Sequence, residues 1–418
     1  MQALNNTDLQ FAFLRSSWGD RGMPGKIVVL ASVHQAREAM KVDQKVWTVA
    51  DGWQVAEQRG AGPGAQLVLL FGARAQLQEP AALQQVRTWF PEAILLGCST
   101  AGEICGTQVR DGSLVATAVR FESTRVRLAR THVEGMEQGY TAGTTLAQAL
   151  SEPGLSHILV LSDGLKVNGT ELVRGLRAAL PEAVVVTGGL AGDGPDFQHT
   201  LVCGNDTPAE GQIAAVGFYG DRLHIGFGSL GGWDAFGPER LITRSKSNVL
   251  YELDGRSALE LYKQYLGEHA AGLPAAALRF PLALRSEKEG HGLVRTVLGI
   301  NEQEQSMTFA GDVPEGSYAR LMKANFDRLI DGAAGAARSG LDRLGDFQPE
   351  LAVLISCVGR KLVLKQRVEE EVESVREVLG PKPVLTGFYS YGEICPNGAV
   401  TQCELHNQTM TITALSES

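Results

Sequence analysis

A short motif, Gly-Glu-Ile-Cys, occurs near both ends of this sequence. It forms Gly102–Cys105 at the end of the run GCSTAGEIC and Gly392–Cys395 at the end of GFYSYGEIC, and Gly192-Asp193 stands at the matching place of GGLAGD. Glycine permits a positive φ or a close approach of the backbone, and a carboxylate can accept N–H bonds from a ligand or from the backbone. The motif therefore predicts either a ligand contact or a turn whose carboxylate binds exposed amides.

Three copies of the motif favour the hypothesis that one or two of these turns also face a pocket. Small residues precede the first motif and aromatic residues precede the third, so their side chains are included in the prediction. The predicted ligand-binding residues are Cys98, Ser99, Gly102, Glu103, Gly192, Asp193, Tyr389, Tyr391, Gly392 and Glu393.

Signatures of catalysis and of metal binding are sparse. Ser99 lies one residue away from the nucleophile position of a G-x-S-x-G elbow, and the sequence contains no P-loop, H-E-x-x-H or C-x-x-C motif. Cys403-x-x-His406 is a lone pair, whereas a structural zinc site needs four ligands. These patterns favour a protein that is not an enzyme, and a hydrolase that uses Ser99 or a cysteine is the weaker alternative.

The motifs follow a unit that is repeated three times. In the first copy, an apolar run at Gln66–Phe71 is followed by a helical pattern from about Pro80 and a second apolar run at Ala93–Leu96. The second copy, from HILVL to AVVV, matches the first without gaps and repeats the Pro-Glu-Ala of Pro91–Ala93 at Pro181–Ala183. The third copy runs from LAVLI to PVLTG. Continuous apolar runs are typical of strands covered on both faces, so each copy predicts a right-handed βαβ unit.

Further strand-like runs follow each unit, which predicts mixed sheets in an α/β fold of two related domains. The glycine-rich segment Gly228–Arg240 suggests a boundary between 1–237, with two copies, and 238–418, with one clear copy. In the second domain, a strand is expected at SNVLYELDG. The longest helix is predicted within SYARLMKANFDRLIDGAAGAARSGLDRL, with an interruption near Gly332.

Composition limits the classes of partner. The 418 residues are 44% hydrophobic and 20% charged, and no window approaches the ~20 consecutive apolar residues that a membrane span needs. The N-terminal residues carry no export signal and the six cysteines are thinly spread, so we expect a cytoplasmic protein with free thiols. A net charge of −9 without a basic cluster argues against nucleic acid. A small ligand or a partner protein is expected instead.

The motifs GCSTAGEI, GGLAGDG followed by FQHT, and GFYSYGEICPNG together resemble those of the FIST family, in the same order and over roughly residues 27 to 415. This resemblance implies tandem N- and C-terminal FIST domains with helix-covered sheets packed face to face, a layered, αββα-like sandwich. It also implies a sensory module for small ligands in bacterial signal transduction. The chain has no output motif of its own, so a histidine kinase or a cyclic-di-GMP enzyme is the implied partner, and a homo-oligomer is compatible with the pattern.

The layout also resembles that of the nitric-oxide-sensing haemoproteins of this family. That resemblance implies a haem whose iron is held by a histidine and whose binding of nitric oxide shifts a conformational equilibrium. His199 follows the second motif and His224 leads into the glycine-rich boundary, so these two are the expected iron ligands by position alone. The alternative is a binding module for amino acids or other polar metabolites, in which Glu103, Asp193 or Glu393 would hold an ammonium group.

Overall fold

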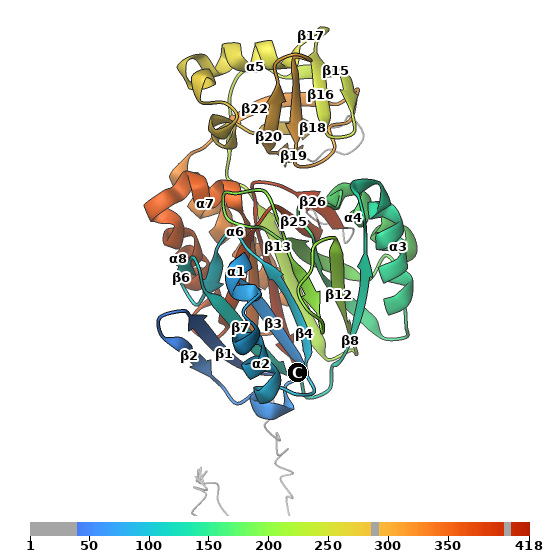
Figure 1. The fold of residues 1–418 in the computed structure, drawn as a ribbon, viewed down its shortest axis with the longest axis vertical. Coiled ribbons are helices and arrows are strands. Elements are labelled where there is room, and N and C mark those ends of the chain that lie inside the picture. The colour runs from blue at the N-terminus through green and yellow to red at the C-terminus, as the bar shows by residue number, and fades with distance from the viewer. Residues whose placement is uncertain (1–39, 286–291, 397–402) are drawn as a thin grey trace, which may run out of the picture. The chain divides into compact units, whose positions relative to one another are not determined.

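The computed structural model describes residues 40–285, 292–396 and 403–418, so the N-terminal segment, in which no export signal is expected, lies outside the described residues. Each of the three repeats forms two parallel strands joined by helical structure, as predicted (Figure 1). The first repeat comprises β3 (Leu67–Gly72), α2 (Pro80–Trp89) and β4 (Ile94–Ser99); the second, β9 (Leu155–Ser162), α4 (Gly169–Ala179) and β10 (Val185–Leu190); the third, β23 (Leu351–Cys357), α8 (Val368–Leu379) and β24 (Val384–Ser390).

Local sequence explains where the first two of these helices begin. Pro80 opens α2, where its fixed φ suits a first turn, and the Glu79 carboxylate accepts a hydrogen bond from the Ala81 amide. The side chain of Asn168 caps α4 by accepting bonds from the amides of Thr170 and Glu171. Two repeats carry an additional helix before the main one: α1 (Arg74–Leu77) precedes α2, and the longer α7 (Val358–Leu364) precedes α8.

A short strand leaves each repeat and joins the sheet of another; this strand contains residues of the motif in the first and third repeats and follows it in the second. β5 (Glu103–Cys105) from the first repeat pairs with β24 of the third. β25 (Gly392–Pro396) from the third pairs with β10 of the second, and β11 (Val202–Gly204) from the second pairs with β4 of the first. The three repeats therefore exchange strands in a closed cycle, always in antiparallel pairing.

Each sheet has six strands and is completed in the same way by antiparallel neighbours. The orders are β11-β4-β3-β7-β1-β2, β26-β25-β10-β9-β12-β8 and β13-β27-β23-β24-β5-β6. The additional strands are β1 (Lys41–Thr48), β2 (Gly52–Gln58), β6 (Gln108–Arg110), β7 (Leu114–Arg120), β8 (Arg125–His132), β12 (Gln212–Tyr219), β13 (Leu223–Leu230), β26 (Cys403–His406) and β27 (Met410–Glu417). The predicted α/β class and the mixed sheets are confirmed.

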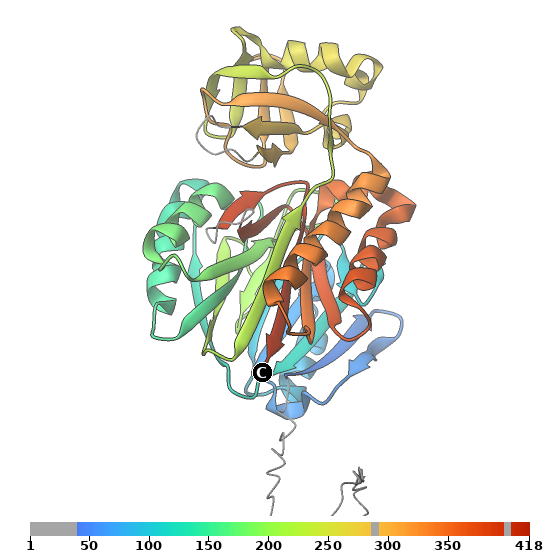
Figure 2. The ribbon, with the colours of Figure 1, turned by 180° about the vertical axis from the view of Figure 1, so that it is seen from behind.

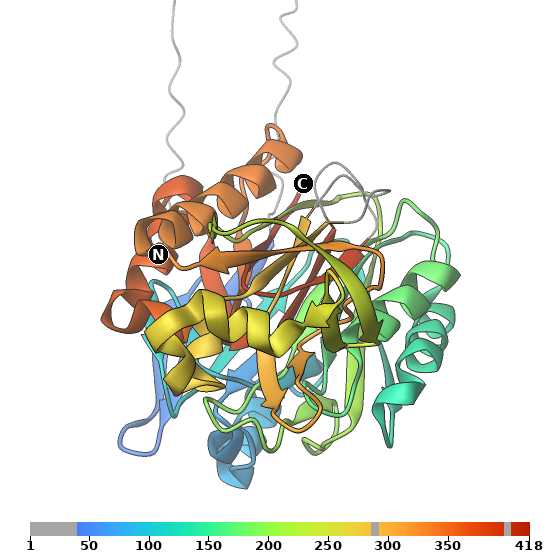
Figure 3. The same cartoon turned by 90° about the horizontal axis from the view of Figure 1, so that it is seen from above.

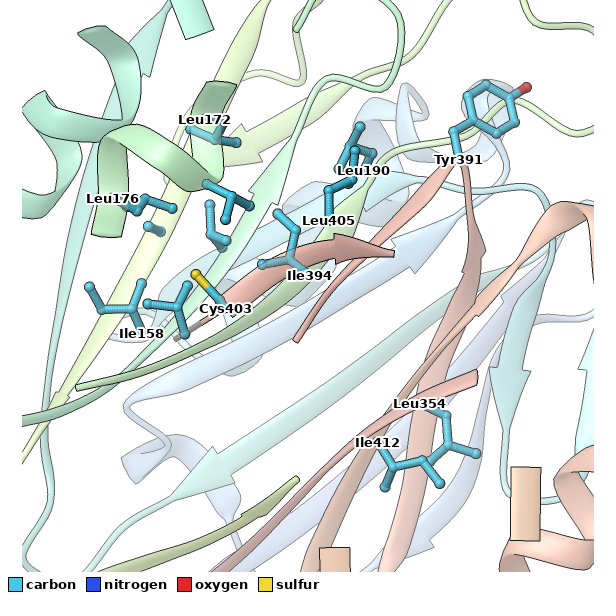
Figure 4. Close-up of a cluster of buried hydrophobic side chains, with 14 of the residues drawn as sticks. Ile158, Leu172, Leu176, Leu190, Leu354, Tyr391, Ile394, Cys403, Leu405 and Ile412 are labelled. Carbon is cyan, nitrogen blue, oxygen red and sulfur yellow. The ribbon is translucent and has the colours of Figure 1, made fainter. Parts of the chain in front are cut away.

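A central core joins the three sheets, and helices cover their outer faces. Phe71, Leu161, Ile355 and Phe388 are among the buried residues that the three repeats contribute to one cluster. Helices α3 (Gly139–Leu150) and α4 pack on the second sheet, whereas α6 (Phe326–Leu344) and α8 pack on the third (Figures 1 and 2). On the outer face of the second sheet, side chains from α4 point toward Ile394 of the exchanged strand β25 and Cys403 of its neighbour β26 (Figure 4).

Between β13 and α6 the chain forms a separate antiparallel sheet with its own core, which we call the inserted sheet. Helix α5 (Ala258–Leu266) lies across this sheet (Figure 3). The described strands are β14 (Asp234–Ala235), β15 (Arg240–Lys246), β16 (Val249–Leu253), β17 (Arg256–Ser257), β18 (Leu282–Arg285), β19 (Gly292–Arg295), β20 (Val297–Asn301), β21 (Ser306–Phe309) and β22 (Tyr318–Lys323). The strand expected in SNVLYELDG is β16, so that prediction is confirmed.

The prediction for the longest helix is partly wrong. Its first residues form β22, which pairs with β18 through Leu321 and Leu282, and the helix begins only after the Asn325 cap. Moreover, α6 continues through Gly332 without a break. A Cβ on Gly332 would lie 2.7 Å from the carbonyl oxygen of Gly231, so the glycine serves a close packing contact.

Minor elements complete the described chain. They are α1 (Arg74–Leu77) and the 3-10 turns Gly62–Gly64, Met136–Gln138, Gly267–Gly272, Ala275–Arg279 and Lys365–Arg367. Within the described ranges, no helix combines the length and the apolar character needed to cross a bilayer.

Candidate functional site

The carboxylate of Glu103 is held inside the protein by hydroxyl groups. It accepts hydrogen bonds from Thr100 Oγ1 at 2.5 Å, from Ser113 Oγ at 2.7 Å and from the Ser113 amide at 3.1 Å. Burial raises the pKa of Glu103 to about 7, although these hydrogen bonds favour the ionised form. The side chain thus ties its turn to the residue that precedes β7.

Glu393 repeats this arrangement in the third repeat. Its carboxylate accepts hydrogen bonds from Ser390 Oγ at 2.6 Å, Thr409 Oγ1 at 2.9 Å and the Thr409 amide at 3.2 Å. Thr409 directly precedes β27, as Ser113 directly precedes β7. Burial raises the pKa of Glu393 to about 8. The two Gly-Glu turns, Gly102-Glu103 and Gly392-Glu393, therefore share one hydroxyl-lined geometry.

The turn of the second repeat is built differently, because Leu190 stands where the other two carry Thr100 and Ser390. Asp193 instead accepts hydrogen bonds from the amides of Gln198 at 2.9 Å and His199 at 2.8 Å, and it contacts the hydroxyl of Tyr391. This carboxylate orders the loop that follows its own turn.

Backbone hydrogen bonds bring the three turns together, although they lie far apart in the sequence. The bonds run from Gly192 N to Ser99 O (2.9 Å), from Ala101 N to Tyr389 O (2.8 Å), from Tyr389 N to Gly102 O (2.8 Å) and from Tyr391 N to Leu190 O (3.1 Å). The predicted residues thus gather at the carboxyl ends of the parallel strands, where α/β proteins place their ligand sites. Their carboxylates, however, are bonded to neighbouring protein groups.

Tyr389 and Tyr391 have separate environments. The hydroxyl of Tyr389 donates a 2.6 Å hydrogen bond to Glu371, which forms a fully buried ion pair with Arg360 at 2.7 Å. Tyr391 stacks on Phe197 with 4.2 Å between ring centroids, and both rings line a small cavity of about 60 Å³. Among the predicted residues, Tyr391 is thus the one that this cavity contacts.

Cys98 and Ser99 are placed for packing in this structure. Ser99 is buried and its hydroxyl accepts a 2.8 Å hydrogen bond from the Leu201 amide. Burial raises the pKa of the Cys98 thiol well above its ordinary value, so the thiol stays protonated at neutral pH. Neither environment activates a nucleophile.

The two expected iron ligands lie in unrelated places. His199 has a half-exposed side chain, and its Nδ1 lies 2.8 Å from Glu210 Oε1. His224 stacks on Phe347 with 3.4 Å between ring centroids, and its Nε2 lies 2.8 Å from Ser418 Oγ. Neither imidazole lines the small cavity beside Tyr391, and neither lines the larger cavity beside α4 that is described below. Among the described residues, no three His, Cys, Asp or Glu side chains lie close enough together to hold a metal ion. The surroundings of these histidines do not fit a haem.

The larger cavity, of about 290 Å³, lies beside α4 and is named the arginine cavity. Its charged wall carries three guanidinium groups, from Arg174, Arg177 and Arg295, and two carboxylates, from Asp312 and Glu404. The rest of its lining is Thr170, Val173, Leu284, Leu293, Pro314, Ser317 and Leu405. A concave site with apolar walls and a few convergent charges is the usual form of a small-molecule site.

Arg295 supplies a fixed positive charge to this cavity. The residue is buried, and its guanidinium donates hydrogen bonds to the carbonyl oxygens of Leu405 at 2.9 Å and Asp312 at 3.2 Å. Burial lowers the pKa of Arg295 to about 10, while Asp312 and Glu404 favour its charged form. The group therefore remains a cation at neutral pH.

Two of the three arginines of the cavity lie on α4 and are exposed. Arg174 and Arg177 are three residues apart and so project from the same side of the helix. The Arg174 guanidinium lies 2.5 Å from the Glu171 carboxylate, and the Arg174 side chain is largely exposed. These two arginines therefore add exposed positive charge to the cavity, in contrast to the buried Arg295.

None of these cavity residues was predicted from sequence as a ligand site. Two signals were nevertheless present. Arg174 and Arg177 form an arginine pair at helical spacing in ELVRGLRAAL, and Arg295 interrupts the otherwise apolar run GLVRTVLGI. A charged residue inside a strand-like apolar run indicates a buried, paired or functional charge.

Comparison with known proteins identifies two family models and one relative. The family model of the FIST N domain matches residues 66–256, and that of the FIST C domain matches residues 258–396. An uncharacterized protein from Methanocaldococcus jannaschii is 22% identical over 350 residues, which is 78% of this chain and 66% of that protein. The match thus spans slightly less than two thirds of the relative's length.

Proposed function

Because the chain belongs to the FIST family, whose domains are sensory modules that bind small ligands, we propose that it senses a small anionic or zwitterionic metabolite, such as an amino acid, in the arginine cavity. The observation that carries this proposal is a cavity that is lined by three arginines, two acidic residues and several apolar side chains. The protein acts in this proposal as a binding protein and not as an enzyme.

The lining supports a ligand that carries both signs of charge. A ligand carboxylate suits Arg174, Arg177 and the fixed cation of Arg295, since guanidinium groups bind carboxylates with directed, charge-assisted hydrogen bonds. A ligand ammonium group suits the carboxylates of Asp312 and Glu404. This assignment moves the ammonium-binding role from the motif carboxylates to two residues of the cavity, of which Asp312 also accepts hydrogen bonds from Asn168 Nδ2 at 3.3 Å and Ser247 Oγ at 3.1 Å.

Thermal unfolding of the full chain tests this proposal. The twenty amino acids, succinate and malate are each added in excess, because a ligand that binds the native state raises its apparent stability. We expect some of these compounds to raise the unfolding temperature. For each amino acid that does so, the derivative in which a carboxamide replaces the α-carboxylate should not raise it. No shift with any compound, or an equal shift with the carboxamide, would contradict the proposal.

The haem and nitric oxide version of the function stays a separate prediction. An absorption spectrum of the chain expressed with haem precursor, recorded oxidised, reduced and with nitric oxide, tests it directly. A stoichiometric Soret band that shifts with nitric oxide would support that version. A colourless protein that takes up no added haemin would remove it.

The signal is proposed to pass to a separate histidine kinase or cyclic-di-GMP enzyme, as the family resemblance implies. A ligand can shift such an output only by its different affinity for two states of the protein. The expected result is a change in the partner's phosphorylation or turnover that depends on the ligand, and an output that the ligand leaves unchanged would contradict this step.

A further inference from the structure

The first repeat carries a second cavity, of about 510 Å³, on the helix face that corresponds to the arginine cavity. The first and second repeats match at a constant shift of 90 positions, which places Pro91–Ala93 on Pro181–Ala183. The residues of α4 that line the arginine cavity are Thr170, Val173, Arg174 and Arg177. Their counterparts in α2, Pro80, Leu83, Gln84 and Arg87, all line this second cavity, which we call the first-repeat cavity.

The opposite walls of the two cavities also correspond. In the arginine cavity, Glu404 and Leu405 lie on β26, which follows the exchanged strand β25. In the first-repeat cavity, the corresponding wall is the segment Cys203–Pro208, which begins within the exchanged strand β11 and continues beyond its end. Val202 and Ala209 close this segment through two 3.0 Å backbone hydrogen bonds. Each cavity thus includes the helix of one repeat and the return segment of the strand that it receives. The inserted sheet adds a further wall to the arginine cavity alone, with Leu284, Leu293 and Arg295.

The charges of the first-repeat cavity are already engaged within the protein. The guanidinium of Arg87 donates hydrogen bonds to Asn205 Oδ1 at 3.3 Å and to the Ala93 carbonyl at 3.3 Å. The carboxylate of Asp206 accepts hydrogen bonds from the Gly204 amide at 2.9 Å and from Gln212 Nε2 at 2.9 Å, and it contacts Arg130. One cation and one anion therefore line this wall, each fixed by its neighbours.

The remaining groups of the lining are uncharged. The carboxamides of Gln78 and Gln84 and the hydroxyl of Thr207 offer both donors and acceptors. Leu70, Leu83 and Leu95 supply apolar wall. The thiol of Cys203 is also uncharged at neutral pH, since burial raises its pKa to about 12. Gln84 stands where the second repeat carries Arg174, which removes one positive charge from this wall.

We propose that the first-repeat cavity is a second small-molecule site, and that it takes an uncharged polar molecule with a carboxamide or a similar donor–acceptor group. Its volume lies in the range of ordinary ligand pockets, from about 300 to 1,000 Å³. The matched construction of the two cavities gives the same protein one site for a charged ligand and one for a neutral ligand.

A matched pair of probes tests the chemical class. Benzamide and benzoate have the same ring and differ in charge, and ligand-observed NMR on the full chain detects weak binding of either. We expect benzamide to bind the wild-type chain with an affinity that Leu83→Trp lowers at least about tenfold by filling the cavity. Arg174→Trp, which adds the same bulky ring to the arginine cavity from an exposed position, should leave benzamide binding unchanged.

Gln84→Arg provides a second test that does not depend on filling the cavity. Gln84 is exposed, so the substitution should leave folding intact, and it restores the charge that Arg174 supplies in the second repeat. We expect benzamide affinity to fall and benzoate affinity to rise. The proposal is overturned if wild-type protein does not bind benzamide, if Leu83→Trp leaves that binding intact, or if Gln84→Arg leaves the preference between the two probes unchanged.

Discussion

The Gly-Glu turns and the arginine cavity differ in what the sequence repeats and what it varies. The turns are nearly identical in the first and third repeats, and their carboxylates are buried and bonded to hydroxyl groups of the protein. The cavity lies on a helix face where the repeats differ, with Arg174 in one and Gln84 in the other. The repeated residues thus hold the exchanged strands, whereas the residues that vary between the repeats line the cavities in which we propose that ligands bind.

The largest effect on stability is expected from Glu393→Ala. This change leaves the buried amide and hydroxyl of Thr409 without their acceptor, leaves Ser390 Oγ with only its 3.3 Å bond to the Ser356 carbonyl oxygen, and opens a void. We expect a loss of about 3 kcal/mol in the free energy of unfolding, measured by urea denaturation. Glu302→Ala, at an exposed ion pair with Lys263, should cost less than about 1 kcal/mol. Equal costs would show that the turn carboxylate is dispensable.

Gly102→Ala should have the next largest effect. Gly102 has φ +140°, and a Cβ there would lie 2.4 Å from the ammonium nitrogen of Lys361, which bonds the Ala101 carbonyl at 2.8 Å. We expect a cost of about 2 kcal/mol, mainly because L-residues disfavour this φ more strongly than the left-handed helical region. Gly106→Ala is the control, because Gly106 has φ +61° and open space around its Cβ position, so its cost should be about 1 kcal/mol. A smaller cost at Gly102 than at Gly106 would contradict the argument from backbone conformation.

A pH-dependent difference is expected for Glu393→Gln. Because burial raises the pKa of Glu393 from 4.5 to about 8, its contribution to stability is fully present below pH 4.5 and is lost as the pH rises through about 8. Glutamine does not titrate, so the variant should gain stability relative to wild type, by roughly 1 kcal/mol or more, between pH 5 and pH 8.5. Urea denaturation at both values measures this. A difference that stays constant with pH would mean that Glu393 is ionised throughout.

Much of the fold could be predicted from local sequence. Continuous apolar runs identified both strands of every repeat, and Pro80 marked the start of α2 because proline suits a first helical turn. The local sequence also explains why a helix was wrongly predicted where β22 forms. SYARLMK has helical spacing of apolar residues, but pairing with β18 and β15 determines its conformation, as tertiary context often overrides propensity.

The strand exchange and the cavity could not be predicted in the same way. The pairing of Gly387 with Ile104 joins residues from opposite ends of the chain, and no local pattern specifies that partner. The motif residues meet through backbone hydrogen bonds between the repeats, which the sequence of a single repeat does not specify. The arginine cavity depends on a contact between Arg295 and Leu405 that only the folded chain brings into register.

The central claim, that the arginine cavity binds the sensed ligand, is tested most directly by one comparison of ligand-induced stabilisation. Each compound that raises the unfolding temperature of wild type is measured again with the double variant Arg174→Gln, Arg177→Gln and with Arg87→Gln, which removes the matching arginine of the first repeat. The account predicts that the double variant keeps its basal stability within about 1 kcal/mol but loses the shift, while Arg87→Gln retains it. An undiminished shift in the double variant would place the ligand elsewhere and contradict the account.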